Sequence, residues 1–179
     1  VIDTHIHADH ISALNELNKR TNCIRVMGEK SKSEVIDLRI KDGEKIKVEE
    51  VELQAIYTPG HTDCSYSFLM NDRVFTGDTL LINGSGRTDF QNGNAYDAYD
   101  SIFNKLLKLP EKTLIFPAHD YNGKKFSTIE NEKNNNPRLQ VSSKEEYADI
   151  MNNLNLANPK MMDVAVPANV KGLTLDNIN

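Results

Sequence analysis

A chain of 179 residues with 39% apolar side chains is about one domain long and has enough apolar material for a buried core. Its net charge of -5 and its scattered lysines and arginines exclude a surface built to bind nucleic acid. No apolar run approaches the roughly 20 residues that span a bilayer, and the two distant cysteines do not make a disulfide framework. These features predict a soluble protein of a reducing compartment, either the cytoplasm or, in a eukaryote, the mitochondrial matrix.

The first half of the sequence predicts a short helix, a strand and two hairpins in chain order. Apolar side chains three residues apart predict a helix over residues 11–20, and residues 23–27 have the composition of a strand. Residues 46–57 alternate apolar and polar side chains about an acidic turn, and residues 67–75 are two strand segments about an Asn-Asp turn. Each hairpin ends a few residues before a side chain that can bind a metal.

The second half predicts two helices, a buried strand and an apolar tail. Aromatic and aliphatic side chains over residues 96–107 have the spacing of an amphipathic helix, which Pro110 ends. Residues 113–116 form an apolar strand, and residues 143–152 form a helix begun by a serine with a glutamate three residues on. Residues 164–169 are apolar enough to pack against the rest of the domain.

The N-terminus leaves little chain to support the first candidate ligand. The sequence starts at Val1 without a methionine, and a histidine already stands at position 5. A ligand loop is normally braced by a sheet on its upstream side, so we expect a piece of a longer protein with edge strands left unpaired. The prediction is one α/β domain over residues 1–179 that lacks its N-terminal strands, with residues 122–179 as a C-terminal extension of loop and helix.

The five histidines are confined to three short segments, and none is left for another role. Residues 4–10 read Thr-His-Ile-His-Ala-Asp-His, and single histidines stand in residues 59–62 and 117–120. A His-x-His pair in a tight loop can direct both imidazoles to one metal, and imidazoles with carboxylates suit zinc or iron(II). An aspartate follows a glycine after the apolar strand, where a fixed carboxylate ligand is expected. The candidate ligands are His5, His7, Asp9, His10, His61, Asp78 and His119.

The order of these segments resembles the metallo-β-lactamase superfamily. The resemblance implies an αββα sandwich with its metal site at one edge. Within the superfamily, residues 84–91 (Gly-Ser-Gly-Arg-Thr-Asp-Phe-Gln), residues 117–121, and residues 153–156 followed by 164–169 are similar to the persulfide dioxygenases, also called sulfur dioxygenases. That branch implies oxidation of a small thiol persulfide, glutathione persulfide above all, by O2 to sulfite and the parent thiol.

The resemblance also implies roles for the candidate residues. One iron(II) per chain is held by His5, His61 and Asp78, an arrangement that leaves positions for persulfide and O2. The other candidate ligands are implied to orient the first set or to hold a second metal. These are His7, Asp9, His10 and His119.

Three further residues are candidates for binding the substrate. An arginine fork can take a carboxylate of glutathione through two hydrogen bonds, which suggests Arg87. Asp89 can take the ammonium end, and Tyr121 stands beside the last histidine segment. The structural alternatives are an ion pair between Arg87 and Asp89 and a packing role for Tyr121.

Two other function classes stay open. A thioester hydrolase of the glyoxalase II kind uses the same ligands for two zinc ions and acts without oxygen, and a non-catalytic metal-binding module predicts neither oxygen consumption nor hydrolysis. The sequence Arg-Thr-Asp-Phe at 87–90 and the short tail after His119 favour the dioxygenase over the hydrolase. The expected partners are the persulfide and O2. A homodimer and a fused or separate rhodanese-like sulfurtransferase are compatible with the sequence.

Overall fold

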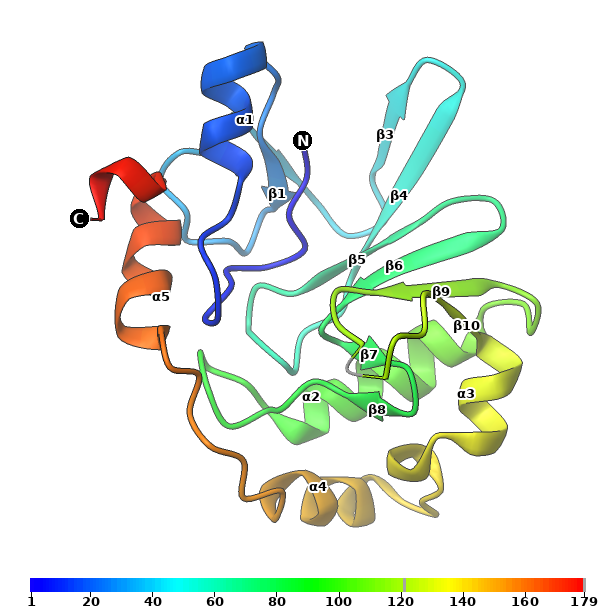
Figure 1. Cartoon of the computed structure of the whole chain (residues 1–179). Helices are drawn as coiled ribbons and strands as arrows, with labels where there is room; N and C mark the ends of the chain where they lie inside the picture. Colours follow the sequence, from blue (N-terminus) through cyan, green and yellow to red (C-terminus); the bar gives the residue numbers. More distant parts are fainter. Residues whose placement is uncertain (121, 179) are drawn as a thin grey trace.

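The computed structural model of the chain describes residues 1–120 and 122–178, and a six-stranded sheet forms its centre (Figure 1). The strand order is β10-β9-β6-β5-β4-β3. Neighbouring strands are antiparallel except β6 and β9, which are parallel. The strands are β3 (Lys45–Val48), β4 (Val51–Tyr57), β5 (Tyr66–Leu69), β6 (Arg73–Gly77), β9 (Leu114–Pro117) and β10 (Ser127–Thr128).

Two smaller sheets flank this one. Strand β1 (Val26–Gly28) pairs in parallel with β2 (Leu38–Ile40), and Ile2 forms an isolated parallel bridge to Val26. Strand β7 (Leu80–Leu81) pairs with β8 (Gly84–Ser85) in an antiparallel hairpin. The N-terminal segment is therefore held beside β1 just before it reaches the first histidine.

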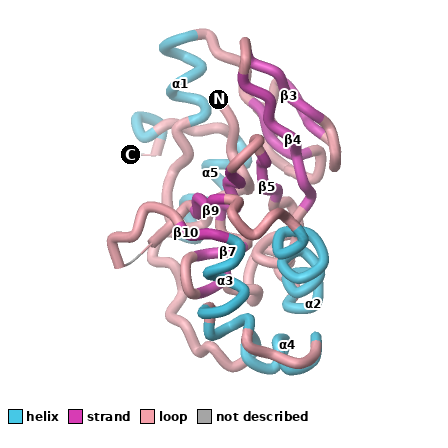
Figure 2. The backbone as a smooth tube through the Cα atoms, turned by 90° about the vertical axis from the view of Figure 1, so that its right-hand side faces the viewer, coloured by secondary structure: helices cyan, strands magenta, loops and turns pink. Residues whose placement is uncertain are grey.

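The helices form two groups. Helices α2 and α3 lie against the large sheet and α4 lies on the far side of α2, whereas α1 and α5 lie on the β1 side of the molecule (Figures 1 and 2). The core between the large sheet and the first group includes Val74 and Ile115 from the sheet and Ile102 and Tyr147 from the helices. The elements are α1 (Leu14–Thr21), α2 (Ala95–Tyr99), the π-helix η1 (Asp100–Lys105), the 3-10 helices η2 (Leu106–Lys108), η3 (Pro137–Leu139) and η4 (Leu175–Asn177), α3 (Ile129–Asn135), α4 (Lys144–Asn152) and α5 (Met162–Lys171).

Most predicted elements agree with the structure. Both hairpins form, with β3 and β4 in place of residues 46–57 and β5 and β6 in place of residues 67–75. The helix expected over residues 143–152 is α4, and its N-cap Ser143 accepts a hydrogen bond from the backbone N–H of Glu146. The strand expected over residues 23–27 is shorter and begins later in the chain, at Val26, because only the residues of β1 pair with β2.

Two helical segments differ from the prediction. The helix expected over residues 96–107 begins as α2 but widens into the π-helix η1 and ends in η2. In the widened turn, Ser101 donates a hydrogen bond to the carbonyl of Pro59 at 2.6 Å, so the irregular turn packs against the loop that carries His61. The apolar tail 164–169 is part of α5, which continues through Pro167. In the part of the chain that the structure describes, no helix is long and apolar enough to cross a bilayer.

Candidate metal centre

Three candidate ligands follow strands that run in the same direction. Strand β4 is antiparallel to β5, and β5 is antiparallel to β6, so β4 and β6 run the same way, as does β9. The C-terminal ends of β4, β6 and β9 therefore meet at one edge of the sheet. His61 follows β4, Asp78 follows β6 directly, and His119 follows β9. A register shift between Phe75 and Gly77 lies just before Asp78, as irregularities beside functional sites often do.

Three imidazoles converge on one oxygen of Asp78. The Nε2 atoms of His5, His61 and His119 lie 3.8, 3.6 and 3.7 Å from Asp78 Oδ2. His5 arrives from the segment that bridges to β1, so the four side chains come from four distant parts of the sequence. The structure thus brings together all three residues predicted to hold one iron, and it adds His119 to the same oxygen.

The hydrogen bonds of two rings leave their metal-binding nitrogens free. His61 Nδ1 lies 2.8 Å from the carbonyl oxygen of Arg87. A carbonyl can only accept, so Nδ1 carries the proton and the lone pair is on Nε2, the atom that faces Asp78. His5 Nδ1 lies 2.9 Å from the hydroxyl of Thr4, an arrangement that likewise directs Nε2 toward Asp78. Such outer hydrogen bonds are how metal-binding histidines are usually oriented.

The donor atoms fit a cation. His5, His61 and Asp78 each offer one ligand atom, and these atoms all lie within 4.8 Å of one another. Asp78 Oδ1 is buried and has no hydrogen-bond donor among the residues that the structure describes. A buried carboxylate oxygen without a donor is costly, and a bound cation removes that cost. Two imidazoles and one carboxylate are a donor set suited to iron(II) or zinc.

The other candidate ligands form a second, more exposed group next to the first. His7, Asp9 and His10 also place one ligand atom each within 4.8 Å of one another. Asp9 connects the groups, because its carboxylate lies 3.0 Å from His10 Nδ1 and 3.2 Å from His119 Nε2. The rings of His5 and His7 are 4.2 Å apart between centroids. All seven predicted ligands therefore lie in one cluster.

A pocket of about 550 Å³ opens onto this cluster, which is within the usual size range for small-molecule sites. Its walls include the ligand candidates at one end and apolar residues of the segment before α5. Several polar side chains, further apolar side chains and one glycine complete the lining. The lining residues are Ala8, Asp9, His61, Asp78, Leu81, Ser85, Gly86, Arg87, Phe90, Gln91, His119, Arg138, Leu156, Ala157 and Pro159.

The guanidinium of Arg87 is engaged within the protein. It donates to both carboxylate oxygens of Asp89 at 2.6 and 2.7 Å and to the carbonyls of Leu156 and Ala157 at 3.2 and 2.6 Å. It also lies 3.9 Å over the ring of Phe90. These contacts match the ion pair that was the structural alternative, and they attach the 156–157 segment to the pocket wall. Tyr121, the third substrate candidate, lies outside the described residues.

A second arginine in the pocket was not predicted. Arg138 is half-buried, follows Pro137 in η3, and donates a hydrogen bond to the carbonyl of Ser85. No carboxylate of residues 1–120 and 122–178 lies within ion-pair distance of its guanidinium. Desolvation by burial lowers the pKa of Arg138. The sequence offered one weak signal: this is the only arginine after Arg87, and it directly follows the expected loop of residues 134–137.

Comparison with known proteins assigns the family. A profile described as the metallo-beta-lactamase superfamily matches residues 27–119, which is more than half of the chain. The chain belongs to the metallo-beta-lactamase superfamily. The matched stretch contains His61, Asp78 and His119 and ends at the last of them. The predicted fold is therefore confirmed, and membership in this superfamily implies a bound metal.

Some superfamily members are similar over nearly the whole chain. The human protein named persulfide dioxygenase ETHE1, mitochondrial, is 45% identical over 173 residues, which cover 95% of this chain and 67% of that protein. The crystal structure of ETHE1 from Myxococcus xanthus has a TM-score of 0.93 and 48% identity, covering 95% of this chain and 75% of that chain. A hydroxyacylglutathione hydrolase from Buchnera aphidicola is 35% identical over 68% of this chain and 48% of that protein. The predicted resemblance to the persulfide dioxygenases is confirmed.

Burial keeps two histidines of this superfamily member neutral. Loss of hydration lowers the pKa of His5 well below its ordinary value, and the neighbouring His7 and His61 lower it further. Loss of hydration and then the neighbouring His10 lower the pKa of His7 to about 4. Neutral imidazoles are the form that binds a metal, so burial prepares these rings for that role.

The metal-free protein should lose stability in mild acid, in part through His7. Its pKa falls from 6.5 to about 4 on folding, so the unfolded chain takes up the proton first and is favoured as the pH falls below 6.5. A shift of this size corresponds to roughly 3 kcal/mol once the pH reaches about 4. We expect the urea concentration at the unfolding midpoint of the chelator-treated protein to be lower at about pH 4.5 than at about pH 7. The same change of pH should lower the midpoint of His7→Gln by a smaller amount. Equal falls in the two proteins would contradict this prediction.

Proposed function

We propose that this superfamily member is a persulfide dioxygenase, which oxidises a small thiol persulfide with O2 at one iron(II). The observation that carries the proposal is the convergence of His5 and His61 on Asp78 beside a pocket, in a chain that is 45% identical to a protein named persulfide dioxygenase over 95% of its length. The match to a hydroxyacylglutathione hydrolase covers only 68% of the chain, which makes thioester hydrolysis the second candidate.

The proposed reaction is balanced by its two substrates and water. The persulfide R-S-SH, O2 and H2O give the thiol R-SH, sulfite and two protons. The outer sulfur loses four electrons, which O2 accepts, and the sulfur-sulfur bond breaks so that the carrier leaves as a thiol. Iron(II) would supply the redox change and the vacant coordination positions, neither of which a closed zinc site offers.

The side chains of the pocket would orient both the ligands and the substrate. His61 keeps its proton on Nδ1 through the Arg87 carbonyl, so Nε2 is available as a ligand. His7, Asp9, His10 and His119 would orient the first set of ligands and bound water. The guanidinium of Arg87 donates to the carbonyls of residues 156 and 157 and so keeps this segment at the pocket wall, while Asp89 holds the guanidinium in place.

Arg138 is the group that we assign to the far end of the substrate. Its guanidinium lies in the pocket without a carboxylate partner among the described residues, so a carboxylate of the carrier thiol would complete its hydrogen bonding. Glutathione carries such carboxylates, and glutathione persulfide is accordingly the proposed substrate. Arg87 is less suited to this role because Asp89 already neutralises it.

The substitution Arg138→Gln should weaken substrate binding more than turnover. Loss of a charge-assisted hydrogen bond is worth about 1.5–3 kcal/mol, so the KM for glutathione persulfide should rise about 10- to 100-fold with a much smaller change in kcat. Oxygen uptake across a range of substrate concentrations separates the two constants. The control substrate is 2-hydroxyethyl persulfide, which has no carboxylate and should show no change. A parallel rise in KM for both substrates would argue against this role for Arg138.

The experiment that tests the function compares two reactions on one preparation. The chain is purified anaerobically, its metal content is measured, and oxygen uptake with glutathione persulfide is set beside hydrolysis of S-lactoylglutathione. We expect about one iron per chain, oxygen uptake and sulfite, with little thioester hydrolysis. Two zinc ions per chain with thioester turnover and no oxygen uptake would replace this proposal with the hydrolase.

A further inference from the structure

We infer that Asn169 of helix α5 is a positioning residue for the metal centre: its side-chain amide holds the backbone of the loop that carries His7, Asp9 and His10. Residues 6–12 form neither helix nor strand, so their backbone groups need partners elsewhere. The side chain that meets three of them stands more than 150 residues later in the sequence. The inference concerns the shape of the ligand loop and does not depend on which reaction the centre catalyses.

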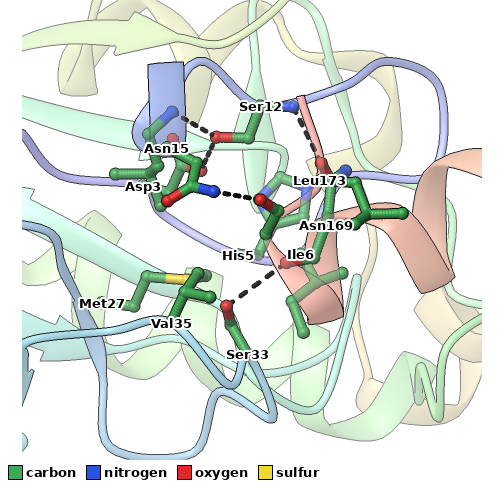
Figure 3. Close-up of a pocket in the computed structure, with 12 residues that line it drawn as sticks. Asp3, His5, Ile6, Ser12, Asn15, Met27, Ser33, Val35, Asn169 and Leu173 are labelled. Atoms are coloured by element: carbon green, nitrogen blue, oxygen red, sulfur yellow. Dashed lines mark hydrogen bonds between the residues drawn. The ribbon is translucent and has the colours of Figure 1, made fainter. Parts of the chain in front are cut away.

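The amide of Asn169 makes three hydrogen bonds to this loop. Its Nδ2 donates to the carbonyl of His7 and to the carbonyl of His10, both at 2.9 Å. Its Oδ1 accepts from the backbone N–H of Ser12 at 2.8 Å, a contact that Figure 3 shows beside His5. The residue is only 9% exposed, so these bonds are sheltered from water. One side chain therefore spans the loop from His7 to Ser12.

The chemistry of the three partners selects asparagine. The two carbonyls require two N–H donors, and the backbone N–H requires an acceptor. A single primary amide provides two donors and one acceptor oxygen. If the amide were rotated by 180°, its oxygen would lie against two carbonyl oxygens and its NH2 group would lie against an N–H. The three partners therefore determine which position holds Nδ2 and which holds Oδ1. Aspartate has the same shape but no donor, and it would place a negative charge against two carbonyl oxygens. Alanine would leave all three groups without this partner.

Helix α5 is held in place by contacts with other parts of the chain, so the position of Asn169 is fixed relative to the ligand loop. Ser33 donates to the carbonyl of Asn169 at 3.2 Å, and the N–H of Glu34 donates to the carbonyl of Val170 at 2.7 Å. Val166 and Val170 pack on a buried cluster that includes Ile6, which lies between the first two histidines. The helix thus contacts the ligand segment through an apolar face and through one polar side chain.

The expected consequence of losing Asn169 is a displaced ligand loop. Outer partners of metal ligands typically change metal affinity by about 10- to 100-fold when they are removed. A residue that only stabilises the fold would change the free energy of unfolding of the metal-free protein and leave the metal affinity of the folded protein as it was. Metal affinity and ligand geometry therefore distinguish positioning from general stabilisation.

The test uses cobalt(II) as a probe on the full chain and needs no turnover. Metal-free wild type, Asn169→Asp and Asn169→Ala are titrated with Co2+ and followed by visible absorption, whose bands report the coordination geometry. The control is Asn152→Asp, the same chemical change at an exposed position of α4. We expect both Asn169 variants, folded by circular dichroism, to bind Co2+ about 10- to 100-fold more weakly with altered bands, and the control to match wild type. Wild-type affinity and bands in folded Asn169 variants would overturn the inference.

A second measurement needs no variant and covers the case in which the substitutions prevent folding. In the 15N-labelled wild-type chain, the side-chain amide resonances of Asn169 are followed by NMR before and after addition of Zn2+. We expect the two amide protons to exchange slowly with water and their resonances to shift when the metal is bound, because the loop that they hold carries the ligands. Rapid exchange, or resonances that do not respond to the metal, would also overturn the inference.

Discussion

The variant Asp78→Asn should lose metal binding almost completely while keeping its fold. Asp78 Oδ2 is the atom on which the Nε2 atoms of His5, His61 and His119 converge. An amide keeps the shape of the side chain but removes the negative charge, so a divalent cation would face neutral ligands at the centre of the cluster. We expect the affinity for iron(II) to fall by more than the roughly 10- to 100-fold that is typical of outer partners, and oxygen uptake with glutathione persulfide to fall with it.

The same variant should be no less stable than wild type once the metal is removed. Asp78 Oδ1 is buried without a donor among the described residues, so the metal-free protein carries an unpaired carboxylate oxygen. The amide of asparagine leaves one polar atom at this position, as the carboxylate does, so the substitution adds no further buried unsatisfied group, each of which costs on the order of 1–3 kcal/mol. Equilibrium dialysis against iron(II) under nitrogen and urea unfolding with chelator measure the two effects. The matched control is Asp149→Asn on the exposed face of α4, which should change neither. Wild-type iron affinity in Asp78→Asn would remove the carboxylate from the proposed ligand set.

The parts of the site that the sequence could predict are those with a local pattern. Alternation in residues 46–57 and 67–75 predicts two hairpins, and each delivers one ligand candidate because strand direction and turn position follow from the same pattern. The spacing of residues 4–10 predicts that several imidazoles can meet one metal, and the structure places His5 and His7 with ring centroids 4.2 Å apart. These signals depend only on residues close together in the chain.

The parts that could not be predicted depend on contacts between distant residues. Nothing near position 169 shows that this asparagine will meet the carbonyls of His7 and His10. The π-helix η1 likewise depends on packing against the His61 loop, since amphipathic spacing alone predicts a regular helix. The state of Arg87 was open in the sequence for the same reason, because the carbonyls of the 156–157 segment that engage it lie some 70 residues away. Pattern identifies the ligand types, and tertiary contacts decide which polar side chains remain available to a substrate.

The variant Gly86→Ala should damage the metal centre although residue 86 has no side chain of its own. A Cβ atom at this position would lie 1.9 Å from the carbonyl oxygen of Asp78 and 3.0 Å from Cγ of His61. Neither atom is the flexible end of a side chain, so the backbone after β6 or the imidazole ring has to move. The ligand atoms of His61 and Asp78 are 3.6 Å apart, and a shift of a few tenths of an ångström in either residue changes how both meet a cation.

We expect Gly86→Ala to lower iron(II) affinity at least as much as loss of an outer partner, about 10- to 100-fold, and to lower oxygen uptake accordingly. The matched control is Gly84→Ala in β8, where the nearest atom to an added Cβ is Leu81 Cβ at 4.0 Å, so the same chemical change makes only an ordinary van der Waals contact. Equilibrium dialysis with iron(II) and urea unfolding of the metal-free proteins separate loss of the site from loss of the fold. If the two alanine variants bound iron(II) equally well, close approach of the backbone at Gly86 would have no part in shaping the centre. The ligand positions would then depend on the loops that carry His61 and Asp78 alone.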